Sequence, residues 1–427
     1  MGILSSAFLS DRSGNFGIMT ALLMVPLVGC AGLALDYAHA LSLRTELYTA
    51  ADAAAVGSIS EKSDAVAAAM TMKGNGTISI AKTDARSIFF SQMSGELTSV
   101  PVNLSIDVTK TANKLNSTVT FSASVPTTFM HVLGQDSITV SGTATAEYQT
   151  ASFMDFYILL DNTPSMGVAA TPTDVSKLEA KTGCAFACHQ MDKSVNNYTI
   201  AKDLGVAMRI DVVRKATQAL TDTAKTERVS ADQFRMGVYT FGTKAEDAKL
   251  TTISNLTSDL TQVKNYTDAV DLMTIPYQNY NKDQLTSFDS AMTQMNTIVD
   301  TAGDGTSNIS PEKILFFVSD GVGDSYKPST CTKKTTGGRC QEPIDTSFCR
   351  PLKDRGVKIA VLYTTYLPLP SNPWYNDWIK PFQNEIPTRM AACASPGLYF
   401  EVSPTEGIAD AMKALFLKVI RAPRLTS

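Results

Sequence analysis

The chain reads Tyr157-Ile-Leu-Leu-Asp161-Asn-Thr163-Pro-Ser165-Met-Gly167 where a hydrophobic stretch, Phe153–Leu160, ends. A short apolar stretch bounded by turn residues is typical of a strand that is buried on both faces of a sheet. A carboxylate and two hydroxyls then follow on alternate residues as the backbone leaves the strand. Side-chain oxygens in this arrangement can converge on one small hard cation. The stretch therefore predicts a buried strand with an oxygen-ligand site at its end.

Hydrophobic strands and helical stretches alternate from Phe153 to the C-terminus. This alternation predicts an α/β fold with a doubly wound, mostly parallel sheet. Two polar inserts, Gly167–Ile200 and Gly321–Pro351, follow strand ends, the edge at which such sheets bind ligands. The expected strands are Phe153–Leu160, Phe234–Phe241, Lys249–Ile253, Ile314–Ser319, Val357–Tyr363 and Leu398–Val402, and the expected helices are Lys202–Thr223, Leu260–Val270, Phe288–Thr301, Trp378–Ala392 and Pro404–Ile420.

Two further segments bring oxygen ligands toward the same edge. The strand Ile314-Leu-Phe-Phe-Val-Ser ends in Asp320-Gly321, and the loop Leu285-Thr286-Ser287 precedes a helix. If the strands that end before Asp161 and Asp320 are neighbours, the two carboxylates and the three hydroxyls meet at one crevice. The sequence alone leaves open whether Thr286 or Ser287 supplies the hydroxyl of the third segment.

The composition excludes some classes of partner. The 427 residues include 37 Lys+Arg and 41 Asp+Glu, which gives a net charge of −4 and no basic field for nucleic acid. The three histidines, His39, His131 and His189, leave little material for histidine-based catalysis or a multi-histidine metal site. We therefore expect no nucleic acid partner, and oxygen ligands rather than nitrogen ligands.

The oxygen-bearing residues resemble the von Willebrand factor A domain and its metal-ion-dependent adhesion site (MIDAS). In that family an Asp-x-Ser-x-Ser motif, a distant Thr and a distant Asp hold a divalent cation and leave one position open. Residue by residue, the resemblance implies that Asp161, Thr163 and Ser165 form the motif, that Thr286 is the distant threonine and that Asp320 is the distant aspartate. It implies Mg²⁺, or Mn²⁺ or Ca²⁺, as the ion.

Such a site favours binding over catalysis. Hydroxyl and water ligands carry no negative charge, so two aspartates leave the cation under-neutralised, and the carboxylate of a partner protein completes its shell. We expect no enzyme activity. Two alternatives remain open: a structural envelope protein with a metal-free head, and a hydrolase built on the paired aspartates. The hydrolase is disfavoured because the sequence shows neither a nucleophile–base pair nor a Gly-rich phosphate loop.

An uncharged stretch near the N-terminus predicts a membrane anchor. The 20 residues Phe16–Leu35 carry no charge, which is about the length that a helix needs to cross a bilayer. Arg12 precedes the stretch, and Asp36 follows it directly, which favours a cytoplasmic N-terminus. A cleaved signal peptide, ending at Ala38-His39-Ala40, and a buried soluble helix are the two alternatives.

The region between this anchor and Phe153 predicts a small α+β stalk module. Small apolar residues from Ala40 to Ala54 recur at helical spacing, which fits either a partner helix or packing on the following domain. Alternation at Val102–Val108, Ser117–Ala123 and Ile138–Ala144 predicts strands. The expected domains are an N-terminus with a transmembrane helix (residues 1–36), the stalk module (37–150) and the von Willebrand A-like domain (151–427).

The cysteines indicate an oxidising compartment. Cys30 lies in the apolar stretch, and the six downstream cysteines form an even set. A local pair in the first insert, a pair that pins a hairpin loop in the second and a remaining pair are favoured, although spacing does not settle the connectivity. The disulfide candidates are Cys184, Cys188, Cys331, Cys340, Cys349 and Cys393.

The N-terminal region resembles the TadE/TadG-like proteins of Flp (tight-adherence, Tad) pilus systems. The resemblance rests on Ser10–Ile18 before the apolar stretch and on the Ala-rich segment Ala34–Ala55. It implies a single-pass inner-membrane protein with its C-terminal part in the periplasm. It also implies a role in pilus assembly or cell adhesion, with pilus-system components as partners bound through the divalent-metal site.

Overall fold

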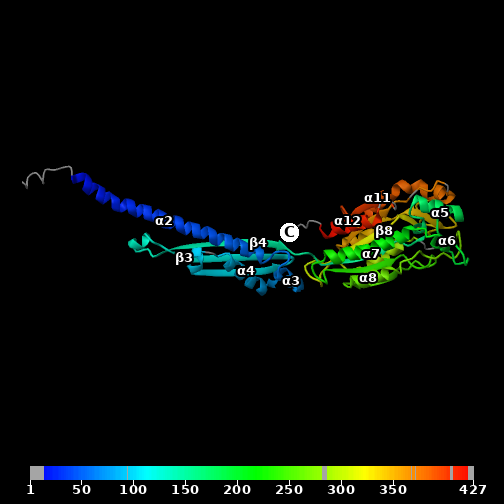
Figure 1. Ribbon diagram of the computed structural model, residues 1–427. Coiled ribbons are helices and arrows are strands. Elements are labelled where there is room, and N and C mark those ends of the chain that lie inside the picture. The colour runs from blue at the N-terminus through cyan, green and yellow to red at the C-terminus, as the bar shows by residue number, and fades with distance from the viewer. Residues whose placement is uncertain are drawn as a thin grey trace, which may run out of the picture. The chain divides into compact units, whose positions relative to one another are not determined.

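The computed structural model describes residues 14–93, 95–280, 286–366, 368–370, 372–403 and 407–421. The chain divides into two compact units, Met1–Thr150 and Ala151–Ser427 (Figure 1). Several features named above lie outside the described residues: the first part of Ser10–Ile18, which includes Arg12, as well as Leu285 and the expected helix start at Pro404.

The first unit consists of one long helix packed on an antiparallel sheet. Its strands pair in the order β1-β2-β3-β4, and Figure 1 shows helix α2 lying along β4. Its elements are α2 (Gly14–Gly57), α3 (Asp64–Thr71), β1 (Gly76–Thr77), α4 (Ser79–Ser91), η1 (Gly95–Ser99), β2 (Val102–Thr111), β3 (Lys114–Pro126), η2 (Met130–Leu133) and β4 (Ser137–Gln149).

The small-residue stripe of α2 packs on its own module. Ala40, Leu43, Leu47 and Ala54 are buried against side chains of β3, β4 and α4. The ring of Tyr48 in α2 packs directly against Gly142 of β4. A Cβ at Gly142 would lie 2.4 Å from Tyr48 Cζ, so the glycine leaves the room that this ring needs. The stripe therefore packs on the strands and helix that follow it in the chain, which confirms the second of its two interpretations.

The N-terminal part of α2 presents its apolar side chains to the exterior. Leu22, Val25 and Leu27 are between 66% and 75% exposed, and α2 is long and apolar enough to cross a membrane. Core helices bury such side chains, so the prediction of a buried soluble helix is wrong for this segment. The helix also continues without a break through Ala38-His39-Ala40, the proposed signal-peptidase site.

The second unit has a six-stranded mixed sheet. The strand order is β13-β12-β8-β5-β6-β7, in which all neighbours are parallel except the antiparallel edge pair of β6 and β7. The prediction of a doubly wound, mostly parallel sheet is confirmed. Its strands are β5 (Met154–Leu160), β6 (Phe234–Thr240), β7 (Thr251–Thr257), β8 (Glu312–Ser319), β12 (Lys358–Thr364) and β13 (Tyr399–Val402).

Helices cover both faces of this sheet. Alternate residues of β5 point to opposite sides, so that Phe156 and Ile158 pack with α7 and α12, whereas Tyr157 and Leu159 pack with α9 and α11. The helices are α5 (Pro172–Thr182), α6 (Asn197–Asp203), α7 (Arg209–Glu227), α8 (Leu260–Thr267), α9 (Phe288–Ile298), α10 (Arg350–Asp354), α11 (Ile386–Cys393) and α12 (Ile408–Ile420), and the short turns are η3 (Pro164–Gly167), η4 (Thr346–Cys349), η5 (Tyr375–Ile379) and η6 (Lys380–Glu385).

Several local predictions differ from the structure. The single helix expected at Trp378–Ala392 is instead a π-helical turn (η5), a 3-10 helix (η6) and the shorter α-helix α11. The helix expected at Lys202–Thr223 is two helices, α6 and α7, separated at Gly205, whose φ of +64° ends the first. Residues 79–91, for which no element was predicted, form helix α4. The second insert contains a separate three-stranded sheet, formed by β9 (Val322–Tyr326), β10 (Thr335–Thr336) and β11 (Arg339–Pro343) in the order β10-β11-β9.

Candidate functional site

The candidate site lies where the direction of strand addition reverses. From β5 the chain adds β6 on one side, and it later returns to place β8 on the other side. The carboxyl edge at such a switch point is where open α/β sheets bind ligands. Asp161 follows β5 and Asp320 follows β8, and the Asp161 N–H donates a hydrogen bond to Val318 O at 2.9 Å. The two aspartates therefore leave neighbouring strands at the switch point.

Asp161 is completely buried and fully engaged in hydrogen bonds. Its Oδ1 accepts hydrogen bonds from the Thr163 backbone N–H at 3.0 Å and from the Thr163 hydroxyl at 2.6 Å. Its Oδ2 accepts a hydrogen bond from the Ser319 hydroxyl at 2.6 Å. The Thr163 and Ser165 hydroxyl oxygens are 3.3 Å apart. The predicted Asp-x-Thr-x-Ser motif is thus one connected cluster of oxygens.

Asp320 joins the same cluster. Its Oδ1 accepts a hydrogen bond from the Val322 N–H at 3.2 Å. Burial and the negative charge of Asp161 raise the pKa of Asp320 to about 7, against the effects of Arg209 and of a hydrogen bond from Ser165. Burial likewise raises the pKa of Asp161, against its hydrogen bonds from Ser319 and Thr163. Two interacting carboxylates that are both buried disfavour each other's ionised form.

Arg209 is the residue of this site that the sequence did not reveal. Its side chain is completely buried, and its Nη1 lies 3.3 Å from Asp320 Oδ2. The guanidinium carbon also lies 5.1 Å from the centroid of the Tyr366 ring. Among the described residues, the Arg209 Nε and Nη2 atoms find no hydrogen-bond partner. A cation between the apolar residues Met208 and Ile210, inside the helix expected at Lys202–Thr223, is the one sequence signal that could have indicated it.

Thr286 lies near the cluster, but its hydroxyl has no described contact with it. The Thr286 and Asp324 backbones pair, with the Thr286 N–H 2.7 Å from Asp324 O and the Asp324 N–H 3.1 Å from Thr286 O. Thr286 and Ser165 line the same cavity. Ser287, the alternative hydroxyl, instead caps helix α9 by accepting a hydrogen bond from the Ser290 N–H at 3.3 Å. Thr286 therefore remains the better candidate of the two.

The side chains of the cluster suit a hard divalent cation. Asp161, Thr163, Ser165 and Asp320 offer only oxygen ligands, which is the donor set of Mg²⁺, Mn²⁺ and Ca²⁺. With both carboxylates ionised, Arg209 neutralises one of the two negative charges, so one net negative charge remains in a buried cluster. A bound divalent cation would remove the repulsion between the carboxylates that raises the pKa of Asp320.

A cavity of about 170 Å³ opens beside Ser165 and Thr286. Both inserts line it, the first through Cys184, Phe186 and Cys188 and the second through Asp324, Arg339 and Gln341. The other lining residues are Pro164, Ile275, Tyr277, Gln278, Asn279, Tyr280, Val322, Tyr366, Asn372, Trp374 and Ile379. The inserts and the aromatic side chains thus shape the approach to the candidate site.

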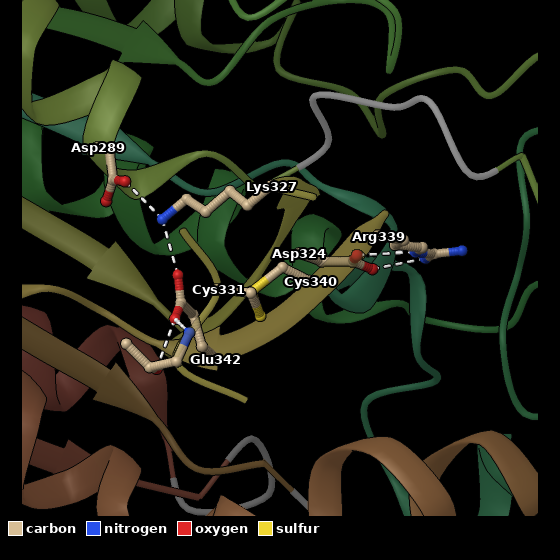
Figure 2. Close-up of a disulfide and its surroundings, with 8 residues drawn as sticks. Asp289, Asp324, Lys327, Cys331, Arg339, Cys340 and Glu342 are labelled. Atoms are coloured by element: carbon tan, nitrogen blue, oxygen red, sulfur yellow. Dashed lines mark hydrogen bonds and ion pairs between the residues drawn. A yellow bond between two sulfur atoms is a disulfide. The ribbon is translucent and has the colours of Figure 1, made fainter. Parts of the chain in front are cut away.

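Ion pairs and a disulfide stiffen the second insert (Figure 2). Lys327 Nζ lies between two carboxylates, 2.5 Å from Asp289 Oδ2 and 2.7 Å from Glu342 Oε1. Arg339 and Asp324 form a bidentate pair, with Nε–Oδ1 and Nη2–Oδ2 distances of 2.7 and 2.5 Å. Because Asp324 pairs with Thr286 through the backbone, this network positions the candidate threonine.

Two of the three expected disulfides are present. Cys331, which precedes β10, is bonded to Cys340 of β11, and Cys349 is bonded to Cys393. The expected local pair in the first insert is wrong: Cys184 and Cys188 are free thiols. The path of that segment is set by pairing with residues 167–169, through a Val168–Phe186 bridge, and the Cys184 sulfur accepts a hydrogen bond from the Phe186 N–H at 3.4 Å.

The comparisons with known proteins match the N-terminal segment to a family. Residues 14–58 match the family described as "Putative Flp pilus-assembly TadE/G-like". The comparison with curated proteins found no match.

Several solved structures are similar to the chain at low sequence identity. The vWF domain of the type V pili tip protein Mfa5 from Porphyromonas gingivalis has 10% identity and a TM-score of 0.36, over 65% of this chain and 99% of that one. The PilB minor pilin from Streptococcus sanguinis has 10% identity and a TM-score of 0.33, over 77% and 79%. The von Willebrand factor type A protein from Catenulispora acidiphila has 9% identity and a TM-score of 0.31, over 75% of this chain and 50% of that one.

The family match agrees with the resemblance of the N-terminal sequence. Over residues 14–58, the chain is similar to the TadE/G-like proteins of Flp pilus assembly.

Proposed function

We propose that this chain is a membrane-anchored component of Flp/Tad pilus assembly or adhesion whose second unit binds a partner protein through a divalent cation. The TadE/G-like match and the apolar part of helix α2 support the pilus context and the anchor. The convergence of the Asp161, Thr163, Ser165 and Asp320 side chains at the switch point of the sheet is the observation that carries the binding role.

The charges of the cluster favour an acidic partner group. Two ionised aspartates and Arg209 leave one net negative charge, and a divalent cation turns this into one net positive charge. A carboxylate from the partner would restore neutrality at a site where an uncompensated charge is costly. The cavity beside Ser165 and Thr286 provides the approach for that group. Asp161, Thr163, Ser165, Asp320 and Thr286 would hold the ion, whose chemistry is to attract the partner's carboxylate.

We propose no catalytic role for the site. The Thr163 and Ser319 hydroxyls that contact Asp161 are completely buried together with it, and we assign this carboxylate to the ion. His189 stacks on Tyr198 at 4.1 Å and lies 3.2 Å from Leu272 O. An activated nucleophile would need a general base within hydrogen-bond reach, oriented by a third group. Binding without bond breaking is the function that the site supports best.

We further propose that the chain crosses the inner membrane once and that its second unit lies in the periplasm. The two disulfides of this unit require an oxidising compartment to persist, and the periplasm is one. Cleavage after Ala40 would cut α2 inside a continuous helix where it packs on its own module. An uncleaved anchor is therefore the better interpretation.

Calorimetric titration of the full chain in detergent with Mg²⁺, Mn²⁺ and Ca²⁺ tests the metal site. We expect a heat of binding for the unmodified chain and none for Asp161→Asn. Asp222→Asn, which removes an exposed carboxylate paired with Lys264, is the matched control and keeps the heat. Capture of pilus-system proteins should follow the same order and be lost in chelator. Capture that Asp161→Asn and chelator leave unchanged would contradict the proposal.

One observation favours a second candidate function. Arg209 already supplies a buried positive charge to Asp320, as expected if the site had exchanged its metal for a cation of its own. The chain would then be a structural envelope protein with a metal-free head. The same titration separates the two functions, because this alternative predicts no heat with any of the three ions.

A further inference from the structure

The loop between β3 and β4 exposes large apolar side chains at its tip. Within Thr127–Asp136, Val132 is 84% exposed, Leu133 is 68% exposed and Phe129 is 45% exposed. Soluble surfaces rarely gather such side chains unless a partner or a membrane covers them. We call the segment Phe129–Leu133 the loop tip.

The loop tip lies against the apolar part of helix α2. Phe129, Val132 and Leu133 line a groove of about 390 Å³ together with Met24, Val25, Val28 and Gly29 of the helix. Gly32 permits this close approach, because a Cβ at that position would lie 2.5 Å from Phe129 Cβ. The helix side of the groove is itself exposed, with Val25 at 75% and Val28 at 62%. The loop and the helix therefore form one continuous apolar surface.

The position of the groove along α2 sets its depth in a membrane. Asp36 is the first charged residue after the uncharged stretch Phe16–Leu35. At 1.5 Å per residue, Gly29 lies about 10 Å and Met24 about 18 Å along the helix from Asp36. The hydrocarbon of a bilayer is about 30 Å thick, so these helix residues lie within it whenever α2 spans it. The loop tip beside them then lies in hydrocarbon too.

The backbone of the loop is prepared for an apolar environment. The Asp36 carboxylate accepts hydrogen bonds from the Thr128, Phe129 and Met130 N–H groups at 3.1, 2.9 and 2.7 Å. The Val132, Gly134 and Gln135 N–H groups bond to carbonyls of the same loop. Backbone groups in hydrocarbon need such internal partners, because no water replaces them.

The polar side chains of the loop are also paired within it. His131 Nδ1 lies 2.6 Å from Asp136 Oδ1, and the Gln135 side chain donates a hydrogen bond to Ser137 O at 2.9 Å. The Thr127 hydroxyl bonds to Gln135 O. These contacts lower the cost of placing the polar groups next to lipid.

We propose that the loop tip inserts among the acyl chains of the membrane that α2 spans, as a second membrane contact of the first unit. The occupant of the groove is lipid, because the loop tip continues the lipid-facing surface of the anchor helix and lies at its depth. The proposal rests on the membrane-spanning role of α2 and is independent of the metal site. It implies that the first unit is held at the bilayer surface by two elements.

Quenching by brominated lipids tests this contact on the full chain in lipid nanodiscs. Val132→Trp places a fluorophore at the loop tip, where the exposed side chain leaves room for it. Thr111→Trp places the same fluorophore at an exposed position at the opposite end of the β2–β3–β4 sheet and is the control. The signal of the native Trp374 and Trp378 is subtracted with the unmodified chain.

We expect lipids brominated on the acyl chains to quench most of the emission of the loop-tip fluorophore and to leave the control bright. The emission of the Val132→Trp variant should also lie to the blue of the control. Discs that hold one copy and discs that hold two copies should give the same result. Quenching no stronger than in the control would overturn the proposal. Loss of quenching in two-copy discs would also overturn it, because a second copy would then fill the groove.

Discussion

Arg209 and Asp320 form an ion pair in which neither side chain is exposed, with Nη1 of the guanidinium 3.3 Å from Oδ2 of the carboxylate. Arg209 does not neutralise all of the negative charge, because Asp161 adds a second buried carboxylate to the same cluster. The site thus combines a cation belonging to the protein with more negative charge than that cation neutralises. If the site binds a divalent ion as proposed, its affinity will depend on the balance between these groups.

Replacing Arg209 tests that balance. Arg209→Met should destabilise the chain in chelator by about 3 kcal/mol, because it leaves a buried carboxylate without its partner. The same variant should bind Mg²⁺ about tenfold more tightly, since it removes a positive charge next to the ion. Urea unfolding in chelator and calorimetric titration measure the two effects.

Arg214→Met is the matched control for this variant. Arg214 lies on the same helix and pairs with Asp211, but both side chains are partly exposed. We expect a small loss of stability and no change in Mg²⁺ affinity. Equal effects of the two substitutions on Mg²⁺ affinity would show that Arg209 does not act on the site.

The Thr163 hydroxyl gives a second test of the metal site. Thr163→Val keeps the shape of the side chain but removes the hydroxyl that contacts Asp161 and Ser165. We expect Mg²⁺ affinity to fall by at least about 10–100-fold, because the hydroxyl is a candidate ligand that also orients the Asp161 carboxylate, and the loss of an orienting group alone has this effect. Thr163→Ser keeps the hydroxyl and should bind Mg²⁺ nearly as well as the unmodified chain. Calorimetric titration measures the Mg²⁺ affinity of both variants. An affinity of Thr163→Val equal to that of Thr163→Ser would count against Thr163 as a ligand.

The positions of Asp161 and Asp320 were predictable because they depend on local patterns. Each follows a hydrophobic strand, and parallel strands place their carboxyl ends on one edge of the sheet. Arg209 was not predictable in the same way, since its burial depends on how the start of α7 packs against that edge. The Asp-x-Thr-x-Ser spacing identifies the candidate ligands of one loop, whereas the position of the neutralising cation depends on tertiary structure.

The cysteines and helix α4 also show that local sequence patterns do not predict features that depend on tertiary structure. Cys331 and Cys340 lie at the two ends of a short segment that turns back on itself, so local sequence was enough to predict their pairing. The path of the chain around Cys184 and Cys188 instead depends on pairing with residues 167–169. Helix α4 buries only Ala81, Ala85 and Phe89, one residue per turn, a stripe too narrow to stand out from the sequence.

Removal of the disulfide in the second insert should loosen the candidate threonine. The double variant Cys331→Ser with Cys340→Ser should lose about 2–3 kcal/mol of stability, the expected effect for a short closed loop. Because β11 pairs with β9, and β9 bridges to Thr286, the amide protons of Thr286 and Asp324 should exchange faster with solvent. Hydrogen exchange measures this change. Cys30→Ser, at an exposed free thiol, is the control and should leave both rates unaltered.

Docking of α2 on its sheet depends on the absence of a side chain at Gly142. A Cβ at this position would lie 2.4 Å from Tyr48 Cζ and 2.7 Å from Phe121 Cζ. Gly142→Val should therefore destabilise the first unit by about 1–3 kcal/mol through overpacking. Gly74→Val is the control, since a Cβ at Gly74 meets nothing within 4 Å. Thermal unfolding compares them, and equal midpoints would mean that α2 does not pack as described.

The ion pairs of the second insert should make the free energy of unfolding depend on pH in the acidic range. Although burial opposes the effect, hydrogen bonds from Lys327 and Thr332 lower the pKa of Glu342 below its ordinary value of 4.5. A carboxyl with a lowered pKa stabilises the fold above its unfolded-state pKa, and this contribution is lost as the pH falls through the folded-state value. We expect Glu342→Gln to flatten the fall in unfolding free energy between about pH 5 and pH 3. Urea titrations across this range test it, with exposed Glu246→Gln as the control that keeps the slope. A slope that Glu342→Gln leaves as steep as in the control would assign the acid sensitivity to other carboxyls.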